Sequence, residues 1–572
     1  MGKRARSVLL GAAATLVLVA AIDLTGLASL PFYSHGEPRE AVVVQEMWRG
    51  NGLMLPLING EIIPWKPPMF HWLGLAAASI QGSVTELAAR LPSATLGILA
   101  TLAVFLFGAT ISRVRSGWLA ALILATSFEW IRASRTARVD MTLTFFLAGA
   151  LLCFALLQHR KQAMATERGA TWLRGLFWAF LAAGTLTKGP VALVLPMLVI
   201  GIWAWTGPLP AAPTTQPARK LRAGKLRRVL AELGVLRGFA VILPLVGIWY
   251  VAGWWIGGTE FLVRHALMEN ILRVLDAERL GSGHIHGPLY MVAHLFLGFL
   301  PWSFLAAPVG YWLWKERPLD ETTRFLVVWF LVIFVFFLIP ESKRGVYLLP
   351  AFPAMALLCG RVLGPGPEGD LPRRLVAWQC NAIAAFAMLI SFITLTAFLM
   401  PLENLLEPIL KPRDLQAARA ALDGLRAGGV FTFAAAIAIL GAAALVIWQA
   451  RGAHWLRASF PMAALLGLLT ITIALPAERG IAQARTLRDF ARQAAARAGD
   501  AQLGIVAGAF EWGTLFYADR HLPPFKGIKA PPAFLIFHNE AAAEVPPSCS
   551  TILKSQGTGP KGRHQYFLAR CD

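Results

Sequence analysis

The feature that most limits how this chain folds is the recurrence of long apolar stretches along it. About 20 apolar residues are enough to cross a lipid bilayer as a helix, and the sequence contains about 13 such stretches. They lie at 8–30, 91–112, 116–134, 139–158, 172–188, 189–206, 237–256, 289–313, 324–340, 345–363, 376–400, 428–449 and 457–477. The sequence therefore predicts a mainly α-helical, polytopic membrane protein.

Composition supports this class and excludes several others. Hydrophobic residues make up 56% of the 572 residues and charged residues only 15%, whereas soluble domains carry about 25% charged residues. This balance excludes a disordered chain, a soluble enzyme and a small disulfide scaffold. The net charge of +21 would suggest nucleic acid in a soluble protein, but loop placement accounts for most of it here, so we expect no nucleic-acid partner.

The basic residues also predict the orientation of the chain, because cytoplasmic loops are enriched in Lys and Arg. The 207–236 loop holds the densest group, made of Arg219, Lys220, Arg222, Lys225, Arg227 and Arg228. With this loop inside, the N-terminus is cytoplasmic, and an odd number of spans puts the C-terminus outside. The first apolar stretch is long for a signal peptide, so we expect an uncleaved anchor.

Two domains are predicted. Residues 1–477 form the membrane domain, with long outer loops at 31–90 and 257–288, and residues 478–572 form a small α/β domain outside. Helices are expected at Glu40–Trp48 and Pro68–Ile80 in the first loop, at Phe261–Asp276 in the second as an amphipathic interfacial helix, and at Ile481–Ala498 and Glu511–Asp519 in the C-terminal domain, with strands at Gln502–Ala507, Phe534–Phe537 and Gln565–Ala569. Cys549 and Cys571 are expected to pair if this domain faces an oxidising compartment.

Charged side chains gather in the predicted outer loops, which indicates a basic cavity containing a few carboxylates. Phosphate esters need Lys and Arg to hold their charge, and transfer of a group from a phosphate leaving group needs the developing charge stabilised. A carboxylate can take the proton of an acceptor hydroxyl. The alternative is structural: Lys188, Lys343 and Arg344 also suit anchors at span ends, and Asp140 suits a helix start. We expect Glu40 and Glu46 to be solvated residues on a helix face.

Motifs in a fixed order along residues 1–480 resemble those of the GT-C membrane glycosyltransferases, in particular the bacterial aminoarabinose transferase (ArnT-like) branch, which is related to the protein O-mannosyltransferases. They are Gly36-Glu37-Pro38-Arg39, Lys66-Pro67-Pro68, the Leu-Pro-Ser run after Arg90, the Met-Thr-Leu-Thr run after Asp140, Leu186 to Pro190, Glu269 to Arg273, Leu300-Pro301-Trp302, and Ser342-Lys343 followed by Tyr347 to Pro350. The resemblance implies a bundle of this size, a polyprenyl-phosphate-linked sugar as donor, and no cofactor.

The resemblance also implies roles for individual residues. Lys66 and Arg273 would hold the donor phosphate, and Arg39 and Tyr347 would line the same site. Glu37 and Asp140 would be the catalytic acidic residues near the sugar or the acceptor. Further residues expected around this site are Lys188, Lys343, Arg138 and Glu269.

Two departures from the family pattern stand out. The first-loop motif of the family usually begins with Asp-Glu, and that Asp is its favoured catalytic acid, but Gly36 stands there in this chain. Either Glu37 or Asp140 takes its role, or the acceptor needs no base, as an anionic phosphate would not. Some members bind a metal through residues at positions that are Trp65 and Met268 here, so we expect no metal ion.

We therefore expect a glycosyltransferase of the bacterial inner membrane that moves a sugar from undecaprenyl phosphate to lipid A or another envelope glycan at the periplasmic face. Its partners would be that donor, that acceptor and the lipid bilayer, and we expect a monomer. The alternatives are a protein O-glycosyltransferase and, outside enzymes, a transporter of lipid-linked sugars. A transporter should show paired broken helices in two repeated halves, and the sequence shows no such symmetry. Neither the sugar nor the acceptor is identified by the sequence.

Overall fold

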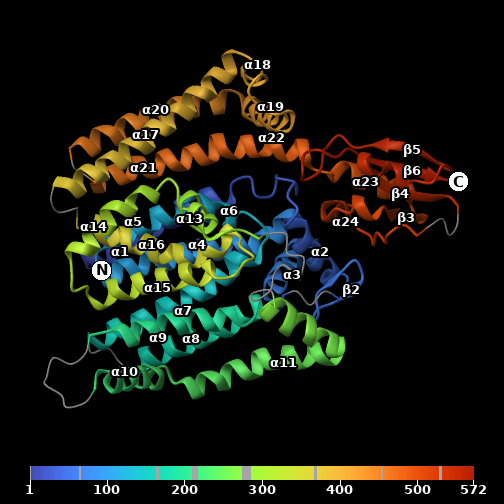
Figure 1. Ribbon diagram of the computed structural model, residues 1–572. Coiled ribbons are helices and arrows are strands. Elements are labelled where there is room, and N and C mark those ends of the chain that lie inside the picture. The colour runs from blue at the N-terminus through green and yellow to red at the C-terminus, as the bar shows by residue number, and fades with distance from the viewer. Residues whose placement is uncertain are drawn as a thin grey trace.

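The structure, a computed structural model, describes most of the chain. It covers residues 2–62, 66–162, 167–208, 217–272, 285–365, 370–452, 455–526 and 531–572. Long helices run side by side through most of the molecule, and a small sheet-containing domain lies beyond one end of them (Figure 1). The labelled N-terminus and C-terminus lie at opposite ends of this arrangement.

Most helices outside the first loop and the C-terminal domain follow the predicted apolar stretches, whereas those at Ala218–Leu233, Leu402–Leu406, Pro412–Ala427 and Leu475–Arg485 lie largely outside them. In chain order the helices of the bundle are α1 (Lys3–Leu24), α4 (Glu86–Ile111), α5 (Val114–Ala125), α6 (Phe128–Ser134), α7 (Val139–Gln162), α8 (Glu167–Lys188), α9 (Val191–Thr206), α10 (Ala218–Leu233), α11 (Val235–Phe261), α13 (Pro288–Gly298), α14 (Ala306–Lys315), α15 (Glu321–Leu338), α16 (Phe352–Leu363), α17 (Asp370–Leu399), α18 (Leu402–Leu406), α19 (Pro412–Ala427), α20 (Gly429–Arg451), α21 (Trp455–Leu468) and α22 (Leu475–Arg485). The mainly helical, polytopic class is confirmed.

The exact number of spans is not confirmed. Within the described residues, nine helices are long and apolar enough to cross a membrane, or ten if α13 and α14, which meet at a bend of 106°, form one broken span. The predicted spans at 116–134, 172–188 and 189–206 do form helices, but these are shorter or more polar than a full span. The count of about 13 spans therefore stays a prediction.

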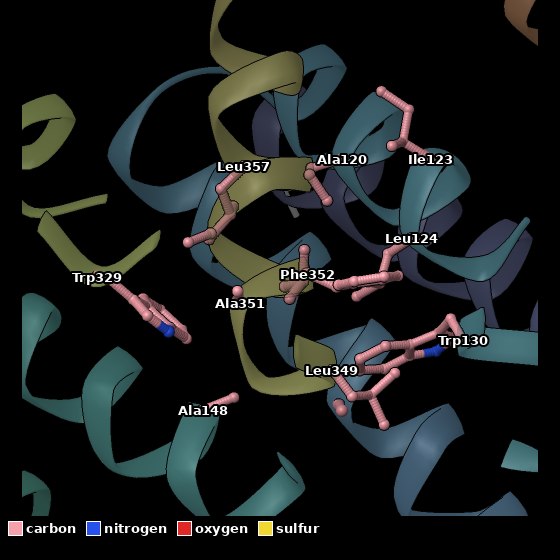
Figure 2. Close-up of a cluster of buried hydrophobic side chains, with 14 of the residues drawn as sticks. Ala120, Ile123, Leu124, Trp130, Ala148, Trp329, Leu349, Ala351, Phe352 and Leu357 are labelled. Atoms are coloured by element: carbon pink, nitrogen blue, oxygen red, sulfur yellow. The ribbon is translucent and has the colours of Figure 1, made fainter. Parts of the chain in front are cut away.

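Packing between helices is dense near the middle of the bundle. Figure 2 shows side chains from α5, α6, α7, α15, α16 and the 3₁₀ helix η3 (Gly345–Ala351) converging there. Trp130, Trp329 and Phe352 are almost fully buried. The indole of Trp329 donates a hydrogen bond to the carbonyl of Pro350 at 2.9 Å, which satisfies its polar atom inside the bundle.

The first outer loop folds into two helices and a small hairpin, and they lie beside the C-terminal domain (Figure 1). Helices α2 (Glu37–Trp48) and α3 (Met69–Gln81) agree with the predicted helices, while β1 (Leu57–Ile58) and β2 (Glu61–Ile62) pair as antiparallel strands. The second loop differs from its prediction. After α11 it continues as a π-helix, η1 (Leu262–Leu272), and the end of the helix predicted at Phe261–Asp276 lies outside the described residues.

The C-terminal domain contains a four-stranded sheet of order β3-β4-β6-β5. Its elements are α23 (Arg488–Ala498), β3 (Gln502–Ile505), η5 (Ala507–Ala509), α24 (Trp512–Ala518), β4 (Ala533–His538), η6 (Asn539–Glu544), β5 (Cys549–Lys554) and β6 (Tyr566–Cys571). Strands β3 and β4 are parallel and the other pairs antiparallel. The single helix predicted at 481–498 is two helices, because the chain leaves helical geometry at Thr486. Cys549 and Cys571 form a disulfide between β5 and β6.

Candidate active site

Helix α2 presents the first charged groups of the site. Gly36 precedes the helix, and Pro38 in its first turn favours a helical start because its φ is already fixed. Glu37 and Glu40 lie in that first turn, where the helix dipole stabilises negative charge. The carboxylates of Glu37 and Glu40 bind different partners, which are described in turn below.

Glu40 is the centre of one ionic cluster. Its side chain is only 5% exposed, and its Oε1 accepts hydrogen bonds from Lys66 Nζ at 2.5 Å and from Arg39 Nη2 at 2.7 Å. Its Oε2 lies 2.9 Å from His71 Nε2, on the first turn of α3. Glu40 thus ties the start of α2 to the Lys-Pro-Pro turn and to α3. The prediction that Glu40 and Glu46 are solvated is wrong, because both side chains are buried.

The ionic cluster shifts the acidity of its members. Burial alone raises the pKa of Glu40, but Lys66, Arg39 and His71 outweigh this and hold the pKa well below its usual value. Burial lowers the pKa of Lys66 to about 8, although the charge of Glu40 opposes the change. The charge of Glu40 raises the pKa of Arg39. Near neutral pH the cluster therefore holds two cations around one carboxylate.

Asp140 is the centre of a second ion pair. It lies in the first turn of α7, and its Oδ1 accepts a hydrogen bond from Lys188 Nζ at 2.6 Å. Lys188 is the last residue of α8, and its Nζ also lies 4.4 Å from the ring centroid of Tyr347, a cation–π contact. Both charged side chains remain partly exposed, at 14% for Asp140 and 23% for Lys188.

Electrostatic coupling indicates that the two groups share one region. The charge of Asp140 acts on the pKa of both Arg39 and Lys66, and the charge of Glu269 acts on that of Arg39. Burial lowers the pKa of Arg344, and the nearby charges of Arg39 and Arg138 act in the same direction. We call the five residues Arg39, Lys66, Arg138, Lys188 and Arg344 the basic cluster; Glu40 and Asp140 lie within it.

Glu37 lies in a different environment. Its side chain is buried, and its carboxylate accepts hydrogen bonds from Arg90 Nε at 2.8 Å and Nη2 at 3.2 Å, and from the backbone N–H of Ala137 at 3.1 Å. Arg90 is fully buried on α4 and also donates to the carbonyls of Leu27 and Leu30. Both oxygens of Glu37 are thus used to join α2 to α4. This geometry suits a structural tie, and the predicted catalytic role of Glu37 stays a prediction.

The position of Gly36 gives a physical reason for the missing side chain there. A Cβ built at Gly36 would lie 3.0 Å from Nη2 of Arg138 and within 3.4 Å of its Nε and Cζ. The guanidinium of Arg138 therefore covers the backbone at this position. Any side chain at residue 36 would have to displace it.

Lys343 is not joined to the cluster by any interaction among the described residues. Lys343 is buried, and its ammonium donates to the carbonyl of Pro340 in its own turn. Arg273 lies outside the described residues. Arg344 follows Lys343 in the chain, and the charge of Asp140 acts on the pKa of Arg344.

Sequence reasoning missed Glu40, as a site residue, and His71. Glu40 follows Glu37 by three residues, so it is one helical turn on, and His71 lies in the helical turn that follows Lys66-Pro67-Pro68. Only their adjacency to motif residues could have marked them. Among the described residues, no group of three or more His, Cys, Asp or Glu side chains is arranged to hold a metal ion. The expectation of no metal stays a prediction.

Comparison with solved structures shows the fold. The chain superposes on ArnT from Cupriavidus metallidurans bound to undecaprenyl phosphate with a TM-score of 0.74, covering 98% of this chain and 97% of that one at 20% sequence identity. The apo state of the same protein gives a TM-score of 0.75 at 18% identity. The whole chain, including its C-terminal domain, therefore has the same overall fold as that protein.

Sequence comparisons agree with this similarity. Residues 52–215 match the family model described as dolichyl-phosphate-mannose-protein mannosyltransferase. An uncharacterized protein of Aquifex aeolicus is 29% identical over 63% of this chain and 66% of its own length. The undecaprenyl phosphate-alpha-4-amino-4-deoxy-L-arabinose arabinosyl transferases of Shewanella sediminis and Pectobacterium atrosepticum are 25% and 26% identical, over 65% and 60% of this chain.

The matches cover 63% of the Shewanella protein and 57% of the Pectobacterium protein, so the chain spans less than two thirds of the length of these three relatives. The predicted resemblance to the GT-C glycosyltransferases of the aminoarabinose transferase branch is confirmed in sequence and in fold.

Proposed function

We propose that this chain, which resembles the GT-C aminoarabinose transferases in sequence and in fold, is a glycosyltransferase that takes its sugar from a polyprenyl phosphate. The donor is inferred from the relatives, which are undecaprenyl phosphate-aminoarabinose arabinosyl transferases, and from the similar structure bound to undecaprenyl phosphate. The acceptor we propose is lipid A or another envelope glycan. The protein works alone, as a monomer of the bacterial inner membrane, with the N-terminus in the cytoplasm and the C-terminal domain in the periplasm.

The observation that carries the proposal is the basic cluster around Glu40 and Asp140. Lys66 Nζ and Arg39 Nη2 both lie within 2.7 Å of one oxygen of Glu40, so this carboxylate holds two cations side by side. Paired cations of this kind suit a phosphate ester, which carries its charge on several oxygens. Lys66 and Arg39 both remain about one quarter exposed, so an anion can reach them.

The chemistry follows from these positions. The bond between the anomeric carbon and the phosphate oxygen of the donor breaks, and a new bond forms between that carbon and an oxygen of the acceptor. The departing polyprenyl phosphate gains negative charge, which Lys66, Arg39 and Arg344 stabilise. Arg273 belongs to the proposed donor site through its motif.

Asp140 is the better placed of the two candidate catalytic carboxylates. It is partly exposed and forms an ion pair with Lys188, whereas Glu37 is buried with both oxygens occupied. With a hydroxyl acceptor, Asp140 takes the proton as the new bond forms. With a phosphate acceptor no proton needs to be removed, and Asp140 instead orients Lys188.

A direct test uses purified protein in vesicles with a radiolabelled undecaprenyl-phosphate sugar and lipid A. Transfer of label to lipid A supports the proposal, and no transfer to any envelope lipid or glycan would refute it. Mass spectrometry of envelope lipids from cells with and without the protein identifies the acceptor. The same measurement on envelope proteins tests a second candidate, transfer to protein, which the match to the protein mannosyltransferase model favours.

A further inference from the structure

The C-terminal domain and the first outer loop share one hydrophobic core. A single cluster of buried side chains contains Val42, Val43 and Met47 of α2 together with Leu515, Phe516 and Tyr517 of α24. Figure 1 shows α2 and α3 lying directly beside this domain. The domain therefore forms part of the surroundings of α2.

Tyr517 joins the domain to the segment that leads into α2. Its hydroxyl accepts a hydrogen bond from the backbone N–H of Phe32 at 2.7 Å and donates one to Glu86 Oε1 at 2.8 Å. The ring of Phe32 packs edge-on against Phe516, with centroids 5.0 Å apart. One phenol oxygen thus fixes the backbone a few residues before Gly36 and links it to the start of α4.

Asp519 holds the other end of α2. Its Oδ1 accepts hydrogen bonds from Gln45 Nε2 at 2.5 Å and from Arg49 Nη2 at 2.6 Å. Next to it, His521 Nε2 lies 2.9 Å from Oε1 of Glu46, a carboxylate that is 1% exposed. The polar side chains at the C-terminal end of α2 are therefore bound to residues of one short segment, 519–521.

The contacts of Tyr517 and Asp519 fix α2 at both ends. The orientation of the Arg39 and Glu40 side chains, which lie in the first turn of α2, therefore depends on these contacts. We propose that the C-terminal domain, through Tyr517 and Asp519, positions α2 so that Arg39 and Glu40 meet Lys66 in the donor-phosphate site. Tyr517 and Asp519 are positioning residues that do not touch the reacting atoms. The inference rests on the proposed function, because it assigns the purpose of the arrangement to donor binding.

Small displacements matter at such a site. A misplacement of about 1 Å can cost about 100-fold in rate when it reaches the reacting groups. Glu40 holds both Lys66 and Arg39 on one oxygen, so any tilt of α2 moves the carboxylate that aligns them. The expected consequence of loosening α2 is weaker donor binding with unchanged acceptor binding.

Asp519 offers a matched pair of variants. It has a positive φ of 52°, a conformation that Gly and Asn adopt more readily than other residues, and its side chain is 71% exposed. Asp519→Gly removes the acceptor without straining the backbone, and Asp519→Asn keeps an oxygen there. We expect Asp519→Gly to speed hydrogen–deuterium exchange in 37–48 about tenfold and raise the KM for the donor about tenfold, with the acceptor KM unchanged. In Asp519→Asn, the exchange rate in 37–48 and the KM for the donor should both stay close to those of the unmodified protein.

Tyr517→Phe is the second variant, since it keeps the ring and removes only the bridging hydroxyl. Its control is Tyr566→Phe, because the ring of Tyr566 packs against Phe490 and His538 within the C-terminal domain. We expect Tyr517→Phe, and not Tyr566→Phe, to reproduce the faster exchange and the higher donor KM. Melting temperature in detergent checks that each variant is folded.

Unchanged exchange in 37–48 for both Asp519→Gly and Tyr517→Phe would overturn the inference. Faster exchange with an unchanged donor KM in an active enzyme would overturn it equally. If the unmodified protein transfers no sugar, the proposed function fails. The positioning of α2 is then tested separately by labelling Lys66 with an amine reagent. Faster labelling in Asp519→Gly and Tyr517→Phe supports this positioning, and unchanged labelling in both overturns it.

Discussion

At the scale of single residues, Lys66 links two properties that a donor site needs. It lies 2.5 Å from Glu40 while keeping 22% of its side chain exposed, so it is held in place and still accessible to an anion. Its positive charge is also sensitive to pH, because burial brings its pKa to about 8.

Removing the positive charge of Lys66 should strongly slow sugar transfer. Lys66→Ala is expected to lower the rate of sugar transfer at least about 100-fold, because a cation that stabilises the leaving phosphate is lost. The measurement is transfer of a radiolabelled sugar by purified protein. Lys220→Ala, an exposed lysine on α10, is the control and should keep normal activity. Normal turnover in Lys66→Ala would refute the phosphate site.

The activity should fall as pH rises through about 8. The folded pKa of Lys66 is lowered, so its cation is present below that value and lost above it. The alkaline limb of the donor kcat/KM profile should lie near that pH. Lys66→Arg keeps its charge throughout, because arginine stays protonated, and should remove this limb. A profile that is identical in both proteins would exclude Lys66 as the group that titrates.

Some residues of the site could be predicted from sequence and others could not. Lys66, Asp140 and Lys188 belong to ordered motifs, and the structure gives Lys66 and Asp140 partners of opposite charge. Glu40 was expected to be solvated because it lies on a polar face of a short helix. Its burial depends on contacts with α3 and the Lys-Pro-Pro turn, which are distant in sequence, so no local pattern reveals it.

At the scale of elements, the two candidate catalytic carboxylates lie in ion pairs of different burial. Glu37 and Arg90 form a buried pair, whereas Asp140 and Lys188 form a partly exposed one. Removing one partner of a buried pair leaves an uncompensated charge and costs about 3–5 kcal/mol. A partly exposed pair stabilises a protein far less.

Two substitutions should therefore behave differently. Glu37→Ala is expected to destabilise the protein by about 3 kcal/mol or more, because Arg90 stays buried without its carboxylate. Asp140→Asn should leave the melting temperature within a few degrees and lower transfer to a hydroxyl acceptor about 100-fold. Thermal melting in detergent and the transfer assay measure the two effects. Equal melting temperatures for Glu37→Ala and the unmodified protein would contradict the structural role of Glu37.

Element boundaries were predictable where one pattern extends without interruption. The apolar runs of α4 and α7 are long and continuous, so the sequence places them well. The stretch 116–134 is divided between α5 and α6, where Thr126 accepts a hydrogen bond from Trp302 and the N–H of Phe128 bonds to Leu300. Strand β5 was not predicted from the sequence. It lies at the edge of the sheet, where it pairs only with β6, and most of its residues are exposed. It therefore lacks the alternating apolar residues that would mark a strand.

At the scale of the whole molecule, the mainly helical class followed from the apolar stretches, but the position of the C-terminal domain did not. Its composition identifies a separate polar unit. The contacts that join it to the first loop pair residues from opposite ends of the chain, such as Phe32 with Tyr517 and Gln45 with Asp519. Periodicity carries no information on pairings of this kind.

The disulfide offers a test of the orientation of the whole chain. Cys549 and Cys571 are bonded, whereas Cys153, Cys359 and Cys380 are free. Disulfides persist in the periplasm and are rare in the cytoplasm. When the protein is denatured without reduction, maleimide should label only the three free cysteines, and all five after reduction. Labelling of Cys549 and Cys571 without reduction in freshly isolated membranes would contradict a periplasmic C-terminal domain.

The shared core of α2 and α24 has a consequence for how the protein is made. The ribosome releases the segment around Phe32 and α2 long before α24, which packs against its apolar side. Until then Val42, Val43 and Met47 lack the contribution of α24 to their shared core. We therefore expect the arrangement of α2 to be completed only when this later segment has folded back onto it.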